Sequence, residues 1–146
     1  MTRRGVDAVE IGQAGTFTRL VTEEEVARFA QVSGDDNALH VDAAFARGTR
    51  FGARIAHGAL LIGYMSAAFT DWWRRHVEGK TDRLAISYGY DRIRFIRPTH
   101  LGDAITAEHR IAEIVSGEDK ALADVTCTNQ RGELVAAARH IVKFVG

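Results

Sequence analysis

The chain has 146 residues, a formal net charge of zero and one cysteine, Cys127. This length fits a single domain, residues 1–146, and the balanced charge gives no overall attraction to nucleic acid or to a membrane surface. One cysteine excludes an intramolecular disulfide and a four-thiolate metal site. No apolar stretch of a secretory signal follows the first residues, Met1 to Arg4, so we expect a cytoplasmic protein.

The first element expected is a short strand over residues 16–21, followed by a helix. Thr22 and Glu25 have the spacing of a capping box, in which each side chain accepts a backbone N–H of the first turn. The helix is therefore expected to begin at Thr22, and Gly34 is a suitable end for it.

A second helix is expected from Gly58 to about Val77, followed by strands to the end of the chain. Its longest apolar run, residues 59–69, is well short of the ~20 residues that cross a bilayer. Because this helix is apolar on nearly all sides, we expect it to be enclosed on all sides. The strands are expected over residues 84–97, 104–115, 121–129 and 134–145, joined by short turns. Helices before strands predict an α+β fold, with an antiparallel sheet curled around the long helix.

The loop after the first helix carries the residues best suited to acid–base chemistry. Asp35 and His40 are five residues apart in a segment rich in turn formers, so a loop can bring both side chains to one point. An imidazole beside a carboxylate can transfer protons near neutral pH. The alternative is a solvated turn with a structural histidine. Asn37 is expected to support the turn, and Asp42 to cap a short helix over residues 43–47.

The start of the long helix is a candidate oxyanion site. Gly58 would let a ligand oxygen approach the free backbone N–H groups at the positive end of the helix dipole. The alternative is that this glycine only permits tight packing. The preceding residue, His57, is expected to orient the turn without transferring protons.

A row of arginines lies near the end of the first long strand. Ile93 and Phe95 are expected on one face of this strand, and Arg92 and Arg94 on the other. Together with Arg97, these guanidinium groups could bind phosphate, although such a row is more often a solvated face.

Three segments together resemble one family, the MaoC-like (R)-specific enoyl-CoA hydratases and dehydratases, which have the hot-dog fold. The resemblance covers nearly all of the chain from Thr16 onward. It rests on an Asp, four intervening residues and a His, followed at this distance by a His-Gly helix start. The segments are Ser33-Gly34-Asp35-Asp36-Asn37-Ala38-Leu39-His40-Val41-Asp42 with Phe45-Ala46, then Ile55-Ala56-His57-Gly58, then Arg94-Phe95-Ile96-Arg97-Pro98 with Gly102-Asp103.

The resemblance implies reversible addition of water to a trans-2-enoyl thioester without a metal or redox cofactor. Asp35 and His40 would hold the catalytic water, and the Gly58 amide would bond the thioester carbonyl. Asn37, His57 and Arg94 are the residues expected on the substrate-binding side. The resemblance also implies a homodimer, and an acyl-CoA or acyl carrier protein thioester as substrate.

Two positions depart from the family pattern. Ala38 stands where the family usually has proline, and Gly63 stands where many members have a small polar residue. The first departure predicts a less rigid loop, and the second removes a hydrogen bond to the aspartate.

Three other functions stay open. A hot-dog thioesterase commonly uses a carboxylate on the central helix, which here carries none before Asp71. A non-catalytic acyl-thioester-binding subunit would not need both Asp35 and His40. A metal site could use Asp35, His40 and His57, although their spacing is not specific for a ligand set.

Overall fold

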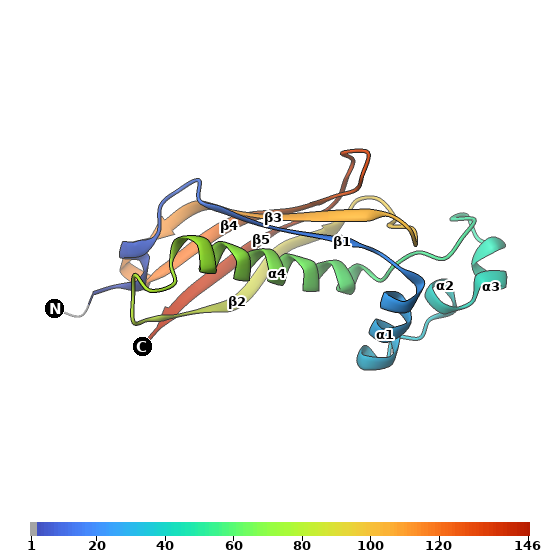
Figure 1. Ribbon diagram of the computed structural model, residues 1–146, viewed down its shortest axis with the longest axis horizontal. Helices are drawn as coiled ribbons and strands as arrows, with labels where there is room; N and C mark the ends of the chain where they lie inside the picture. The colour runs from blue at the N-terminus through green and yellow to red at the C-terminus, as the bar shows by residue number, and fades with distance from the viewer. Residues whose placement is uncertain (1–2) are drawn as a thin grey trace.

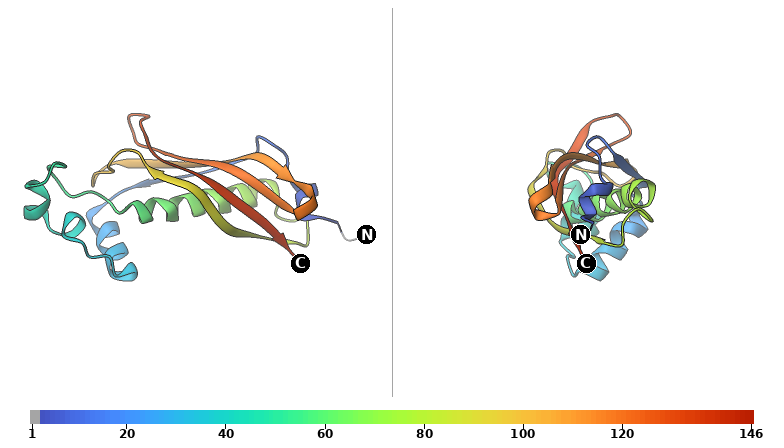
Figure 2. Two further views of the ribbon diagram at one scale, coloured as in Figure 1. Left: turned by 180° about the vertical axis from the view of Figure 1, so that it is seen from behind. Right: turned by 90° about the vertical axis from the view of Figure 1, so that its left-hand side faces the viewer.

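The computed structural model describes residues 3–146, so Met1 and Thr2, which form part of the N-terminal prediction, lie outside the described residues. The long helix α4 (Gly58–His76) lies under one antiparallel sheet, and three short helices lie beyond the end of that sheet (Figure 1). The five strands have the order β1-β3-β4-β5-β2, and the sheet is open. It curves over α4 in the views from behind and end on (Figure 2). The fold prediction is confirmed.

The element bounds agree closely with those expected from the sequence. The strands are β1 (Ala14–Leu20), β2 (Leu84–Phe95), β3 (Ala104–Val115), β4 (Lys120–Thr128) and β5 (Leu134–Val145). The short helices are α1 (Glu23–Ser33), α2 (Ala38–Val41) and α3 (Ala43–Arg47), with 3-10 turns η1 (Gly5–Ala8) and η2 (Ser116–Glu118). Within residues 3–146, no helix is long and apolar enough to span a bilayer.

Helix α1 has the predicted ends and half of the predicted capping box. The Thr22 hydroxyl accepts the backbone N–H of Glu25 at 3.1 Å, as expected for an N-cap. The Glu25 carboxylate, however, lies 3.7 Å from Arg19 of the preceding strand. Gly34 ends the helix in the left-handed region, at φ 82°.

Helix α4 buries one side only. Leu61, Met65, Ala68 and Trp72 are buried in the core, which this helix forms mainly with β1 and β3. The opposite side is a stripe of small residues, and its members Ala59, Gly63 and Ser66 are exposed. The expectation that the helix is enclosed on all sides is therefore wrong for the single chain.

Strand β2 forms one edge of the sheet and differs from its prediction near its end. It ends at Phe95 instead of Arg97, and a bulge interrupts its pairing with β5 between Asp91 and Arg94. Arg92 takes a positive φ of 55° within this bulge. The simple alternation expected for residues 91–97 is wrong, because the bulge turns consecutive side chains out of register with the pleat.

Candidate active site

The end of α1 positions Asp35. The left-handed turn at Gly34 reverses the chain direction after the helix, and the Asp35 N–H then donates to the Ser33 hydroxyl at 3.1 Å. The backbone carbonyl of Asp35 accepts the ring N–H of His57 at 2.8 Å. These bonds fix the backbone at Asp35 and leave its carboxylate exposed, where Oδ1 accepts the Asn37 N–H at 3.3 Å.

His40 lies on the one-turn helix α2, which Asn37 caps. The Asn37 amide oxygen accepts the Leu39 N–H at 3.0 Å, as the sequence predicted for a turn-supporting residue. Nδ1 of His40 lies 2.7 Å from the Ile55 carbonyl. Because a carbonyl only accepts, Nδ1 carries the hydrogen and Nε2 of the neutral ring carries the lone pair. His40 therefore presents a base nitrogen in a fixed orientation.

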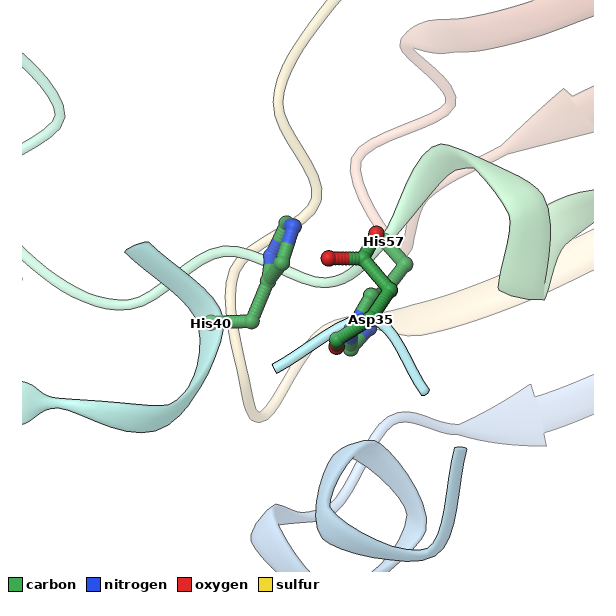
Figure 3. Close-up of side chains that lie close together, drawn as sticks. All are labelled: Asp35, His40 and His57. Carbon is green, nitrogen blue, oxygen red and sulfur yellow. The ribbon is translucent and has the colours of Figure 1, made fainter. Parts of the chain in front are cut away.

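His57 connects the loop to the start of α4. Its ring is 1% exposed, stacks on His40 with centroids 3.8 Å apart, and meets the Phe29 ring edge-on at 4.8 Å. Nε2 donates to Asp35, while Nδ1 has no bonding partner among residues 3–146. His57 thus orients both neighbours, and the close-up shows all three side chains converging (Figure 3).

The three side chains form a compact cluster with an open centre. The Asp35 carboxylate and ring nitrogens of His40 and His57 lie within 4.8 Å of one another. A metal bound to both rings would have to lie about 2 Å from each nitrogen and in both ring planes. The rings are stacked with only 26° between their planes, so their lone pairs do not converge on one point. The cluster is better suited to holding a water between Asp35 and His40.

Gly58 and His40 both line a groove of about 380 Å³. As the first residue of α4, its N–H has no partner within the helix and lies at the positive end of the helix dipole. A Cβ at this position would lie 2.7 Å from the ring of Phe95, which also lines the groove. A side chain here would therefore require the Phe95 ring to move, and with glycine the residue borders the groove, where a ligand oxygen can approach its amide.

The other predicted residues lie around this cluster or away from it. Asp42 caps α3, with its carboxylate accepting the Phe45 N–H at 3.0 Å. Arg94 is exposed, donates to the carbonyl of Ile93 at 2.7 Å, and does not line the groove of His40 and Gly58. Its substrate-binding role stays a prediction, as does that of Asn37.

Two arginines do line the groove with His40 and Gly58. Arg97 belongs to the row noted in the sequence, whereas Arg50 was not singled out. Arg50 lies in the irregular segment between α3 and α4, where no periodicity indicates the direction of a side chain.

An open antiparallel sheet over one long helix, with a carboxylate and an imidazole at the start of that helix, defines a hot-dog protein with an acid–base site. Residues 8–131 match the family model described as MaoC like domain. The chain belongs to this family.

Two curated relatives are similar over nearly their whole length. The (R)-specific enoyl-CoA hydratase of Aeromonas caviae is 33% identical over 139 residues, covering 94% of this chain and 96% of the relative. The 3-hydroxyacyl-thioester dehydratase Z of Mycobacterium tuberculosis is 32% identical over 140 residues, covering 93% and 89%.

Solved structures agree in fold. The unliganded R-hydratase of Pseudomonas aeruginosa has a TM-score of 0.80 at 31% identity, over 96% of this chain and 84% of that one. The (R)-hydratase of A. caviae has a TM-score of 0.81 at 29% identity, over 93% and 97%.

Proposed function

We propose that this protein is a hydro-lyase that catalyses reversible addition of water to trans-2-enoyl-CoA thioesters. One observation carries the proposal: the Asp35 carboxylate lies beside His40, and His40 lines the same groove as Gly58, whose amide is at the start of α4. The curated relatives are named as hydratases and dehydratases of such thioesters, which supports the same reaction here.

The geometry supports a division of work between the three groups. Asp35 and Nε2 of His40 both accept hydrogen bonds, so a water between them is held by its two hydrogens. As its oxygen forms the bond to C3, one of these groups takes a proton, and the same pair delivers a proton to C2. The Gly58 N–H bonds the thioester oxygen, where negative charge develops as the enolate forms.

The thioesterase alternative is less well supported by the central helix. Asp71, its first carboxylate, lies near the far end of α4 from Gly58. It accepts the Thr16 N–H at 2.8 Å and the Arg75 guanidinium at 2.7 Å. The backbone bond from Thr16, followed by the bond from Arg75, lowers the pKa of Asp71 below its usual range. A carboxylate engaged in this way supports the fold and is a poor base for hydrolysis.

The reaction is tested with crotonyl-CoA as substrate. A hydratase consumes the enoyl absorbance without releasing thiol, and the product is 3-hydroxybutyryl-CoA. Thiol release that matches substrate loss would establish hydrolysis and overturn the proposal. The variants Asp35→Asn and His40→Ala should strongly slow both absorbance loss and product formation.

We also propose that the working protein is a homodimer formed through β2. This strand has an unpaired edge, and Leu84 and Tyr88 on it are 63% and 67% exposed. Phe95, at the end of the same strand, is 53% exposed and lines the groove. A second copy along this edge would cover apolar surface and close the groove.

Light scattering of the purified protein tests the dimer. Tyr88→Lys should convert it to a monomer, whereas Val32→Lys, at a still more exposed apolar residue on α1, should not. A wild-type monomer, or equal effects of both variants, would contradict the interface. The cytoplasmic location stays a prediction.

A further inference from the structure

The groove that contains His40 and Gly58 carries two positive charges and no negative one. Arg50 and Arg97 line it together with apolar residues, and none of its described lining residues is acidic. Elsewhere on the surface, several arginines are paired with carboxylates.

Both guanidinium groups are held in place with donors to spare. Arg97 donates from Nη1 to the Leu134 carbonyl at 3.1 Å, and its Nε lies 3.7 Å from Glu133. Glu133 itself makes closer bonds to Arg131, at 2.6 Å, and to Asn129, at 3.0 Å. Its charge is therefore shared, and it neutralises Arg97 only in part.

Arg50 has no carboxylate partner within residues 3–146. Its guanidinium carbon lies 5.3 Å from the centre of the Phe51 ring, a contact that orients the group and leaves its donors free. Guanidinium groups bond phosphate oxygens through two parallel donors. Two such groups on one groove without a carboxylate are complementary to a phosphate.

We propose that Arg50 and Arg97 bind a phosphate at the outer end of the substrate's pantetheine arm. The inference rests on the proposed function, which requires the thioester to lie between His40 and Gly58 in the same groove. The arm leads from that thioester to a phosphate in both CoA and acyl carrier protein thioesters. The two arginines thus recognise the carrier, while Asp35 and His40 carry out the chemistry.

The test compares crotonyl-CoA with crotonyl-pantetheine, which has the same reacting atoms and no phosphate. Arg50→Gln and Arg97→Gln should each raise the KM for crotonyl-CoA about tenfold, with kcat nearly unchanged. The double variant should lose about 10²-fold in kcat/KM and become less sensitive to salt. Its activity on crotonyl-pantetheine should equal that of the wild type.

The matched control is Arg74→Gln, which removes the same charge from an exposed position. Arg74 lies sixteen residues after Gly58 on α4, about 24 Å along the helix. This variant should behave as the wild type on both thioesters. Equal losses of the double variant on both substrates, or no loss on either, would overturn the proposal.

Calorimetric titration with CoA and with pantetheine separates this proposal from the proposed reaction. If the wild type hydrates neither thioester, the reaction is wrong, and CoA binding that weakens in the double variant still supports the phosphate site. CoA binding that is as tight in the double variant as in the wild type overturns the phosphate site. Crotonyl carrier protein serves as a third substrate. If the double variant loses activity equally on crotonyl-CoA and on crotonyl carrier protein, the bound phosphate is the one next to pantetheine. If the double variant loses activity on crotonyl-CoA alone, the bound phosphates are those of the nucleotide.

Discussion

The molecule contains two clusters of histidines with opposite properties. In the core under the sheet, His109 and His140 are joined at 2.8 Å, and His140 bonds the Ser87 hydroxyl at 2.7 Å. Both rings are 0% exposed. Burial lowers the pKa of His140 to about 4, and burial together with the neighbouring His140 lowers that of His109 to about 3. Both rings are therefore neutral at neutral pH.

The difference lies in what each ring nitrogen can reach. In the core, both nitrogens of His140 are bonded inside the protein, and the remaining nitrogen of His109 is buried. At the groove, one nitrogen of His40 is fixed by the Ile55 carbonyl, and the other belongs to a ring that lines open space. A histidine is suited to proton transfer when one nitrogen is anchored and the other is accessible, and burial alone does not provide this.

The largest effect is expected from removing the accessible base. His40→Ala and Asp35→Asn should each reduce the hydration of crotonyl-CoA on the order of 10³-fold, because the water loses one of the two groups that can take its proton. Absorbance assays measure the rate, and circular dichroism confirms that each variant is folded. If either variant hydrates crotonyl-CoA at the wild-type rate, that residue does not take part in the reaction, and its role is structural like that of the core histidines.

A smaller loss is expected when the Gly58 amide, in the same groove as His40, is obstructed. In Gly58→Ala the new methyl group would meet the Phe95 ring and displace the thioester oxygen, with a loss of about 10²-fold in kcat. Shortening the opposing ring in Gly58→Ala/Phe95→Leu should recover part of that loss. A double variant as slow as the single one would show that the defect is not this contact.

The core pair predicts sensitivity of the fold to acid. The unfolded chain takes up protons on its histidines near pH 6.5, whereas His140 and His109 in the fold do so only near pH 4 and pH 3. Their contribution to stability is therefore complete above about pH 6.5 and is lost as the pH falls toward 4. Between about pH 8 and pH 5 we expect the free energy of unfolding to decrease by about 2 kcal/mol for each histidine.

Urea unfolding across this pH range measures the effect. His109→Gln and His140→Asn should each reduce the acid-induced loss of unfolding free energy by the contribution of one histidine. This change in pH dependence is expected whatever the stability of the variants at neutral pH. A wild-type unfolding midpoint that stays constant between these pH values would contradict the prediction.

The sequence predicted local features and missed those that depend on partners distant in the chain. Thr22, Gly34 and Asn37 act on neighbouring backbone groups, so their roles follow from spacing alone. The pair of His109 and His140 could not be predicted, because β3 and β5 meet only through β4.

Two other features could not be predicted from the sequence for the same reason. The bulge at Arg92 depends on how β2 pairs with β5, and the open stripe on α4 depends on which surfaces a single chain covers. Asp35 and His40 could be expected as a pair, but the bonds that orient them come from Ile55 and His57, fifteen and twenty-two residues away.

The smallest effect concerns the cap that holds His40 in its accessible position. Asn37→Ala removes the acceptor for the Leu39 N–H and should cost about 1 kcal/mol, fraying the single turn of α2. We expect a decrease of a few fold in kcat, because His40 is then aligned for part of the time only. Asn37→Asp keeps the acceptor and should restore kcat. If Asn37 instead binds substrate, as the family resemblance suggests, the alanine variant should raise KM, and aspartate should not rescue it.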